Sequence, residues 1–248
     1  LMNLGLGPAY TNEDLHLQHY SKIQKSAEIK LDTKAALPLL PPKARLLIVI
    51  PFRDKWSLTE RCLKGLLSQQ HDGLEILVAL VDNGSVEAET KNGLKLARPL
   101  FEAAGFLFRV LRYEIPFNFS YLNNQAIRDC GDFKADVLAL VNNDIEFIDS
   151  DSLLQLVRGS YLPDAGAVGC TLLYPNHLVQ HLFIFVGSKI VGSHPYKGQP
   201  VHLQSRWYEK PRAVGAGTGA VMFIQRERFE KVHGFDELLP TSYQDVDL

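Results

Sequence analysis

Residues 46–54 are LLIVIPFRD. They begin with a short apolar run, rich in β-branched residues, that stops at Pro51, and the charged residues Arg53 and Asp54 follow soon after. Such a run is typical of a buried parallel strand. The pattern returns twice, where residues 74–81 are followed by Asp82-Asn83-Gly84-Ser85 and residues 137–141 by Asn142-Asn143-Asp144. Because the carboxyl ends of parallel strands lie along one edge of a sheet, we expect these polar groups to converge on one crevice.

Helical periodicity separates these runs. We predict helices over residues 57–70, 87–104 and 120–130, and a further strand over residues 106–112. Ser57 and Glu60 have the spacing of a capping box, and Gly105 stands where a helix would end. Strands and helices that alternate in this way predict an α/β fold, with a Rossmann-like, mostly parallel sheet flanked by helices.

The two ends of the chain differ from this centre. Residues 1–44 predict a helical arm followed by a proline-rich linker at Pro38–Pro42, and residues 45–248 predict one domain. Beyond residue 159 we expect strands over 165–173 and 214–224, a short helix over 227–232, and loops with irregular strands over 176–211. The chain starts without Met and stops at Leu248, which suggests a domain truncated at its C-terminus.

Composition narrows the function classes. The 248 residues include 26 basic and 28 acidic side chains, for a net charge of −2, so no strong attraction to nucleic acid is expected. The apolar runs are far shorter than the roughly 20 residues of a membrane span, and no secretory leader is visible. Three scattered cysteines favour neither a disulfide framework nor a thiolate metal site. A soluble, cytoplasmic protein is the expectation.

Each polar group also has an ordinary explanation. Asp82-Asn83-Gly84-Ser85 could be a simple turn, and Asn142-Asn143-Asp144 could cap the next element. The tract Gly215–Gly219 could allow close packing, a lone histidine such as His181 is more often structural, and terminal carboxylates are usually solvated. The sequence has neither a GxxxxGK[ST] phosphate loop nor a GxGxxG turn after the first strand.

Taken in order, the motifs resemble those of the inverting family 2 glycosyltransferases, which have the A-type nucleotide-sugar-binding fold. The resemblance covers residues 45–248 and is nearest to bacterial rhamnosyltransferase-like enzymes of surface-polysaccharide biosynthesis. It is carried by Ile48–Pro51, Val81–Ser85, Pro116–Ser120 with Asn123-Asn124, Val141–Glu146, Leu173–Pro175, Gln180-His181, Ala213–Met222, Gly234–Glu237 and Asp245–Leu248.

The resemblance implies a role for each matching residue. Pro51, Phe52, Arg53, Asp82, Asn124 and Asn142 would bind the nucleotide, with Asp82 on the base. Asp144, the last residue of a DxD-type motif written here as Asn-Asn-Asp, would hold Mg²⁺ or Mn²⁺ against the diphosphate. Asp245 would be the catalytic base, and Gly217, Thr218, Gly219 and His181 would lie on the acceptor or donor-sugar side. Gln244 departs from the Glu or Asn that relatives commonly have before the base.

The expected activity is metal-dependent, inverting transfer of a sugar from a nucleoside-diphosphate donor to a hydroxyl of a glycan or lipid-linked acceptor. Lipid-linked acceptors would bring the full-length protein to the inner face of the plasma membrane. The alternative is a non-catalytic nucleotide-sugar or glycan-binding module of a larger assembly protein. A nucleotidyltransferase is disfavoured, since the basic, glycine-rich loop that it would need after the first strand is missing.

Overall fold

The computed structural model describes residues 37–186, 191–201 and 211–248, which fall into two compact units. The large unit comprises residues 37–170 and 217–248, and the small unit lies within residues 171–216. The helical arm expected over residues 1–44 lies outside the described residues except for its last few, which form the approach to the first strand.

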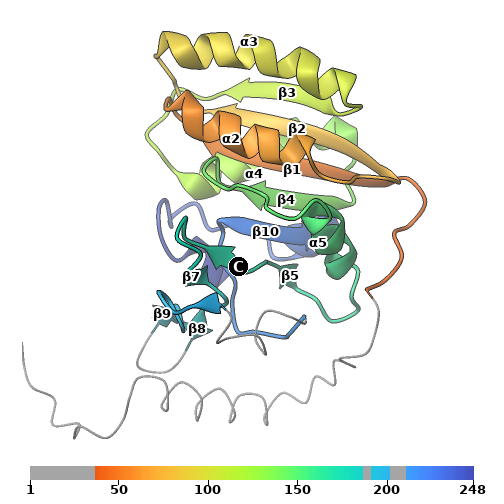
Figure 1. Ribbon diagram of the computed structural model, residues 1–248, viewed down its shortest axis with the longest axis vertical. Helices are drawn as coiled ribbons and strands as arrows, with labels where there is room; N and C mark the ends of the chain where they lie inside the picture. The colour runs from red at the N-terminus through yellow and green to blue at the C-terminus, as the bar shows by residue number, and fades with distance from the viewer. Residues whose placement is uncertain (1–36, 187–190, 202–210) are drawn as a thin grey trace, which may run out of the picture. The chain divides into compact units, whose positions relative to one another are not determined.

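A six-stranded sheet forms the centre of the large unit (Figure 1). Its strands, in spatial order, are β3 (Leu107–Arg112), β2 (Leu74–Asp82), β1 (Ala44–Phe52), β4 (Val137–Val141), β10 (Val221–Gln225) and β5 (Ala167–Val168). The first four are parallel, whereas β10 runs antiparallel to both of its neighbours. The predicted mixed, mostly parallel sheet is therefore confirmed.

Helices cover the two faces of this sheet. The helices of the large unit are α2 (Trp56–Leu67), α3 (Ala88–Ala103), α4 (Phe119–Asp129), α5 (Ser152–Ser160), α7 (Arg226–Lys231) and α8 (Gln244–Asp247), with a 3₁₀ turn at Gly131–Phe133. Leu47 and Val49 of β1 pack against Leu122 and Ala126 of α4 in the main core. Side chains alternate along a strand, so Ile48 points to the opposite face, on the side where α2 lies in Figure 1.

The predicted helices and parallel strands agree with these bounds to within a few residues, but three local predictions are wrong. Ser57 does not cap α2, which begins at Trp56 after Lys55 in a left-handed conformation and has no side-chain cap. The strands predicted over 165–173 and 214–224 are much shorter, because each segment is partly a connection along the chain from the large unit to the small unit. Helix α5 was not predicted.

Gly93 of α3 lies against the indole ring of Trp56, where α2 and α3 meet. A Cβ atom at residue 93 would overlap with the Cε2 atom of the Trp56 ring. Since Trp56 is buried, we expect Gly93→Ala to lower the free energy of unfolding by about 2 kcal/mol, despite the roughly 1 kcal/mol that alanine gains in helix propensity. Urea denaturation of Gly93→Ala and of the control Asn92→Ala, on the exposed side of the same helix, measures the difference. Equal stability of the two variants would contradict the close packing.

The small unit consists of two short antiparallel pairs in the part that the structure describes. They are β6 (Leu172–Leu173) with β7 (Val179–His181), and β8 (Phe185–Val186) with β9 (Val191–Ser193). Phe183 and Phe185 form its apolar cluster. Within the large unit, the flanking strands β5 and β10 pair directly, with Ala167 opposite Ile224, so the chain leaves the sheet and returns to it at adjacent strands.

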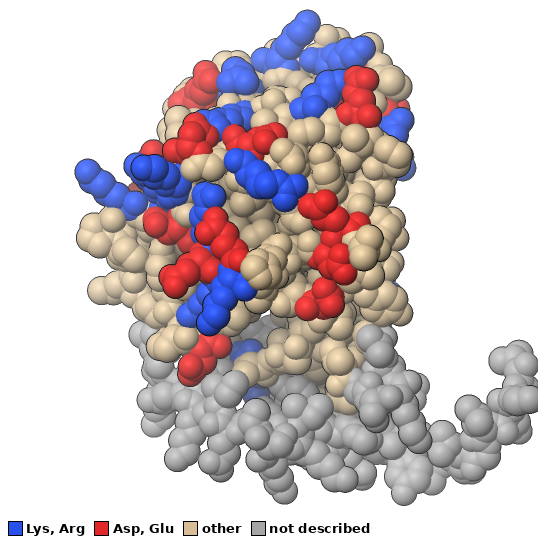
Figure 2. Space-filling model, turned by 180° about the vertical axis from the view of Figure 1, so that it is seen from behind, with Lys and Arg blue, Asp and Glu red and all other residues tan. Residues whose placement is uncertain are grey.

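Acidic and basic side chains are interspersed on the surface of the large unit that Figure 2 shows. Several form ion pairs, including Arg109 with Asp132 and Arg128 with Glu237. Among the described residues, no helix has the length and apolar character to cross a bilayer.

Candidate active site at the carboxyl ends of β1 and β4

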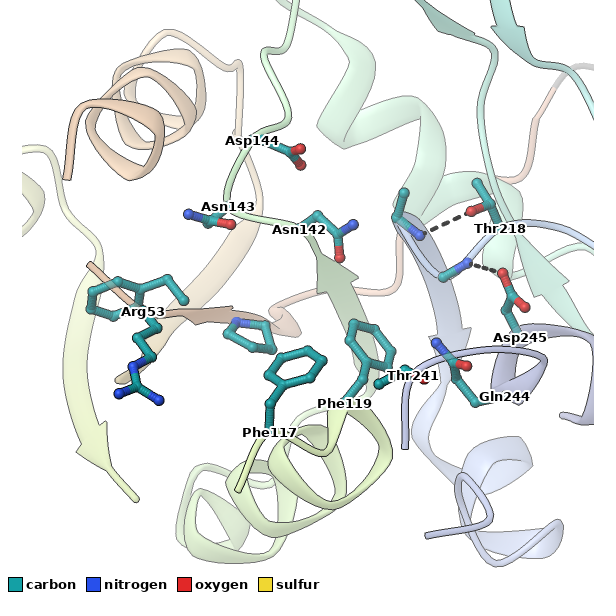
Figure 3. Close-up of a pocket in the computed structure, with 14 residues that line it drawn as sticks. Arg53, Phe117, Phe119, Asn142, Asn143, Asp144, Thr218, Thr241, Gln244 and Asp245 are labelled. Atoms are coloured by element: carbon teal, nitrogen blue, oxygen red, sulfur yellow. Dashed lines mark hydrogen bonds between the residues drawn. The ribbon is translucent and has the colours of Figure 1, made fainter. Parts of the chain in front are cut away.

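A cavity of about 360 Å³ opens in the large unit where β1 and β4 end (Figure 3). The antiparallel pairing of β10 with β4 places Val221 opposite Val141, so the residues before β10 lie beside those after β4. Helix α8 closes one end of the cavity. The lining residues are Pro51, Phe52, Arg53, Phe117, Phe119, Asn142, Asn143, Asp144, Thr218, Gly219, Ala220, Thr241, Gln244 and Asp245.

The end of β1 is held in place by a turn of two left-handed residues. Asp54 and Lys55 have φ values of 52° and 47°, a conformation that costs free energy for residues other than glycine. Asp54 compensates for it by bonding to the loop after β2, where its Oδ1 accepts from the backbone N–H groups of Val86 (2.8 Å) and Glu87 (2.9 Å). The bond from Glu87 is the largest influence that lowers the pKa of the Asp54 carboxyl. This turn fixes the backbone immediately after Arg53, which lines the cavity.

The three residues after β4 are oriented in different ways. The backbone N–H of Asn142 donates to the carbonyl of Ala220 at 2.9 Å, which ties this loop to β10. Asn143 donates through Nδ2 to Thr59 Oγ1 of α2 at 3.0 Å. Asp144 is exposed, and its carboxylate stands free of β4 at the wall of the cavity in Figure 3.

Asn142 and Asp144 match the donor set that a hard divalent cation takes. Magnesium is usually held by one or two carboxylates, with water and substrate phosphates completing its shell. One exposed carboxylate and an amide oxygen therefore fit Mg²⁺ or Mn²⁺ bound together with a diphosphate. Among the described residues, no group of three or more His, Cys, Asp or Glu side chains could hold an ion without such help.

Asp245 is held at the other end of the cavity by the segment before β10. Its Oδ2 accepts from the backbone N–H of Gly219 at 3.0 Å (Figure 3). A Cβ atom on Gly219 would lie 3.4 Å from the Cβ of Asp245 and 3.6 Å from the ring of Phe119. These are ordinary van der Waals distances, so the hydrogen bond, and not the absence of a side chain at Gly219, fixes one oxygen of Asp245 and leaves the other to interact with a ligand.

Helix α4 anchors the segment that carries Asp245. The Nδ2 of Asn118 donates to the carbonyl of Glu237 at 2.9 Å, and the hydroxyl of Ser120 donates to the carbonyl of Leu239 at 2.7 Å. The amide of Asn124 donates to the carbonyl of Phe235 at 2.9 Å and accepts from the backbone N–H of the same residue at 3.1 Å. These bonds place residues 235–240 against α4 and lead the chain into α8.

Of the residues predicted from the sequence, those that line the cavity are Pro51, Phe52, Arg53, Asn142, Asp144, Thr218, Gly219 and Asp245. Asp82, Asn124 and Gly217 do not line it. Asp82 is buried, and its carboxylate accepts hydrogen bonds from the backbone N–H of Ser85 and from Arg112. Asn124 is committed to Phe235 and Glu237.

The structure adds six residues to the lining to which the sequence assigned no site role: Phe117, Phe119, Asn143, Ala220, Thr241 and Gln244. Phe117 and Phe119 belong to the motif Pro116–Ser120, so their presence in it was an available signal. No signal in the sequence indicated Thr241, because its position in the cavity depends on how residues 235–240 are bound to α4.

His181 belongs to the small unit, where it is buried beside His194. Their Nδ1 atoms lie 3.0 Å apart, so one imidazole donates to the other. Burial, and secondarily the neighbouring His194, lower the pKa of His181 to about 4. This imidazole is therefore neutral at pH 7.

The lowered pKa of His181 predicts a loss of stability in acid. Above pH 6.5 the side chain is neutral in both folded and unfolded chains, whereas between pH 6.5 and 4 only the unfolded chain takes up the proton. We expect wild type to lose up to about 3 kcal/mol over this range relative to His181→Phe, at 1.36 kcal/mol per pH unit. Chemical denaturation of both proteins at pH 7.5, 5.5 and 4.5 measures it. Parallel pH curves would contradict the buried, neutral pair.

A search against models of protein families finds no match for this chain. Two curated relatives match it: the uncharacterized protein y4gI of Sinorhizobium fredii, 34% identical over 81% of this chain, and the O-antigen biosynthesis protein RfbC of Myxococcus xanthus, 29% identical over 93%. This chain spans only 22% and 18% of their respective lengths.

Solved structures show the same fold. The mannosyltransferase PcManGT of Pyrobaculum calidifontis, solved with GDP-Man and Mn²⁺, superposes with a TM-score of 0.59 at 17% identity, covering 93% of this chain and 57% of that one. TarS 1–349 of S. aureus, solved with UDP, gives 0.55 at 11% identity, covering 82% and 53%. The chain therefore has the A-type fold of glycosyltransferases, as its sequence motifs predicted.

Proposed function

We propose that this chain is the catalytic domain of a glycosyltransferase that moves a sugar from a nucleoside-diphosphate donor to a hydroxyl of a glycan or lipid-linked acceptor. The observation that carries the proposal is that two carboxylates, Asp144 and Asp245, line opposite ends of one cavity. Arg53 and Asn142, which follow β1 and β4, line the same cavity. A mannosyltransferase of this fold was solved with a nucleotide sugar and Mn²⁺, and a relative is named for O-antigen biosynthesis. The first supports a nucleotide-sugar donor bound together with a metal ion, and the second supports a role in surface-polysaccharide synthesis.

The chemistry divides between the two carboxylates. Transfer breaks the bond between the anomeric carbon and the leaving diphosphate oxygen and forms a bond to the acceptor oxygen, whose proton must be removed. Asp245 takes that proton, because the N–H of Gly219 occupies one of its oxygens and leaves the other for the acceptor. A single displacement with one base inverts the anomeric centre and needs no covalent intermediate.

The negative charge of the leaving diphosphate would be stabilised at the end of the cavity opposite Asp245. When bound, Mg²⁺ or Mn²⁺ would neutralise negative charge on the diphosphate, and Asp144 with Asn142 would hold it. Phe117, which is 53% exposed at the cavity, offers an apolar surface for a sugar or base. Asp82 would contribute to base binding through the turn that it stabilises after β2, since two protein groups already donate to its carboxylate.

Thermal unfolding with UDP, dTDP or GDP, each with and without Mn²⁺, tests the proposal. A ligand that binds only the folded protein at a hundredfold excess over its Kd stabilises it by about 2.7 kcal/mol. We expect a manganese-dependent rise in Tm with one of the three nucleotides, and transfer when the matching nucleotide sugar and a glycan acceptor are supplied. Binding without transfer would favour the non-catalytic module, and no rise with any nucleotide would contradict the proposal.

A further inference from the structure

The residues that follow β4 form a β-turn that carries Asp144. The backbone N–H of Ile145 donates to the carbonyl of Asn142 at 3.3 Å, so Asn143 and Asp144 occupy the two central positions of the turn. The carboxylate of Asp144 is exposed, and no hydrogen bond from the described part of the chain holds it. Its direction therefore depends on how the turn as a whole is held.

Helix α2 holds this turn at two points. The hydroxyl of Thr59 accepts a hydrogen bond from Nδ2 of Asn143 at 3.0 Å. Three residues further along α2, the thiol of Cys62 donates to the carbonyl of Asn142 at 3.7 Å. Both α2 side chains are fully buried. The helix therefore fixes the turn through one side chain and one main-chain group.

The bond between Thr59 and Asn143 orients the turn. A hydroxyl that is buried without a partner costs free energy, whereas valine has the same shape and would bury only apolar atoms at residue 59. Asn143 is only half-buried, so its amide could bond to water and does not need Thr59 as a partner. In Figure 3 the side chain of Asn143 points away from those of Asn142 and Asp144. The consequence of the bond is thus that Asn143 is drawn to α2 while Asp144, the next residue, faces the cavity.

We propose that Thr59 is a positioning residue for Asp144, the carboxylate that would hold the metal ion. This inference rests on the proposed function and adds to it how the metal side of the site is held in place. Residues that orient the ligands of a metal contribute to its affinity although they do not touch it. Helix α2 begins at Trp56, three residues after Arg53, so the same helix joins the turn after β4 to the end of β1.

Thr59→Val tests the proposal, because valine keeps the shape of the side chain and removes only the hydroxyl. Calorimetric titration of the full chain gives the Kd of UDP, dTDP or GDP, whichever wild type binds, with and without Mn²⁺. We expect the Kd with Mn²⁺ to rise about tenfold, in the range that such orienting residues contribute, and the Kd without metal to stay at the wild-type value. Thr59→Ser, which keeps the hydroxyl, should restore the wild-type Kd in both titrations.

Stability measurements separate this role from a structural one. Thr59→Ser loses a methyl group from a fully buried position, so its Tm without ligand should fall below that of wild type although its metal dependence is kept. Thr59→Val loses no buried volume, and its Tm should stay close to that of wild type although its metal dependence is lost. Thr90→Val is the matched control, since Thr90 of α3 is equally buried and its hydroxyl has no partner among the described residues. It should leave both Kd values unchanged and should not lower the Tm.

Asn143→Ala removes the same bond from the other side. It should raise the Kd with Mn²⁺ as Thr59→Val does. The double variant should bind no more weakly than Asn143→Ala alone, because the effects of two residues that share one contact do not add. An additive loss would mean that the two residues act separately and would contradict the positioning role.

The outcomes distinguish the two proposals. If wild type binds a nucleotide more tightly with Mn²⁺ and Thr59→Val keeps the full effect of the metal, the role of Thr59 is refuted while the proposed function stands. Equal weakening of Thr59→Val with and without Mn²⁺ would show that Thr59 supports the whole site and would overturn the inference as well. If wild type binds none of the three nucleotides, the proposed function fails and the inference fails with it.

Discussion

Asp245→Asn should lower kcat for sugar transfer by a factor of about 10² to 10⁴, the range that a positioned general base contributes. An asparagine oxygen can still accept the bond from the N–H of Gly219 at 3.0 Å, so the fold around α8 should be retained. The amide has no carboxylate to take the proton of the acceptor. Initial rates of nucleotide release in the presence of acceptor measure the loss.

Asp247→Asn provides the matched control for this variant. Asp247 lies two residues further along the same short helix, is exposed and does not line the cavity. It should transfer sugar at the wild-type rate, and Asp245→Asn should still show the nucleotide-dependent rise in Tm. If Asp245→Asn transferred sugar at the wild-type rate, Asp245 would not be the general base.

Asp144→Ala should abolish the manganese-dependent part of nucleotide binding. The variant leaves the amide of Asn142 without a carboxylate beside it, and a hard cation binds poorly to amide oxygen alone. We expect the Kd of the nucleotide in the presence of Mn²⁺ to rise at least tenfold, toward its value without metal, and transfer to fall about 10²-fold or more. Calorimetric titrations with and without Mn²⁺ measure the first effect.

The control for Asp144→Ala is a residue of the same loop, which connects β4 to α5. Asp149 is exposed five residues later, outside the cavity lining, and its alanine variant should bind nucleotide and Mn²⁺ as wild type does. If Asp144→Ala kept the full effect of Mn²⁺, another part of the chain would hold the cation.

Much of the fold could be predicted because apolar patterning decides it. The runs at β1, β2 and β4 are buried throughout their central residues. Continuous apolar runs of this kind are typical of parallel strands that helices cover on both faces. The start of α2 could not be predicted in the same way. Its entry depends on two strained residues that are held by bonds to a loop about thirty residues later, and local capping rules do not include such bonds.

The site was predictable in part for a related reason. Strand ends meet at one edge of a sheet, which places residues 51–53 beside residues 142–144. Asp82 follows the same rule, yet Arg112 from the end of β3 donates a hydrogen bond to its carboxylate. Nothing in the sequence around Asp82 indicates that partner. Asn124 likewise bonds to a segment 111 residues away, so its role in anchoring α8 is visible only in three dimensions.

The direct pairing of β5 with β10 has a consequence for how domains of this fold diversify. The chain leaves the sheet beside the strand to which it returns, so the excursion between them is a loop whose two ends are already held together. The entropy of closing a loop grows slowly with its length, by about 0.6 kcal/mol for each doubling. Residues 171–216 can therefore be lengthened, shortened or exchanged for the corresponding segment of another protein of this fold, while β4, which precedes Asp144, and β10, which follows Gly219, keep their register. Natural variation and laboratory grafting should both find this the most permissive position in the domain.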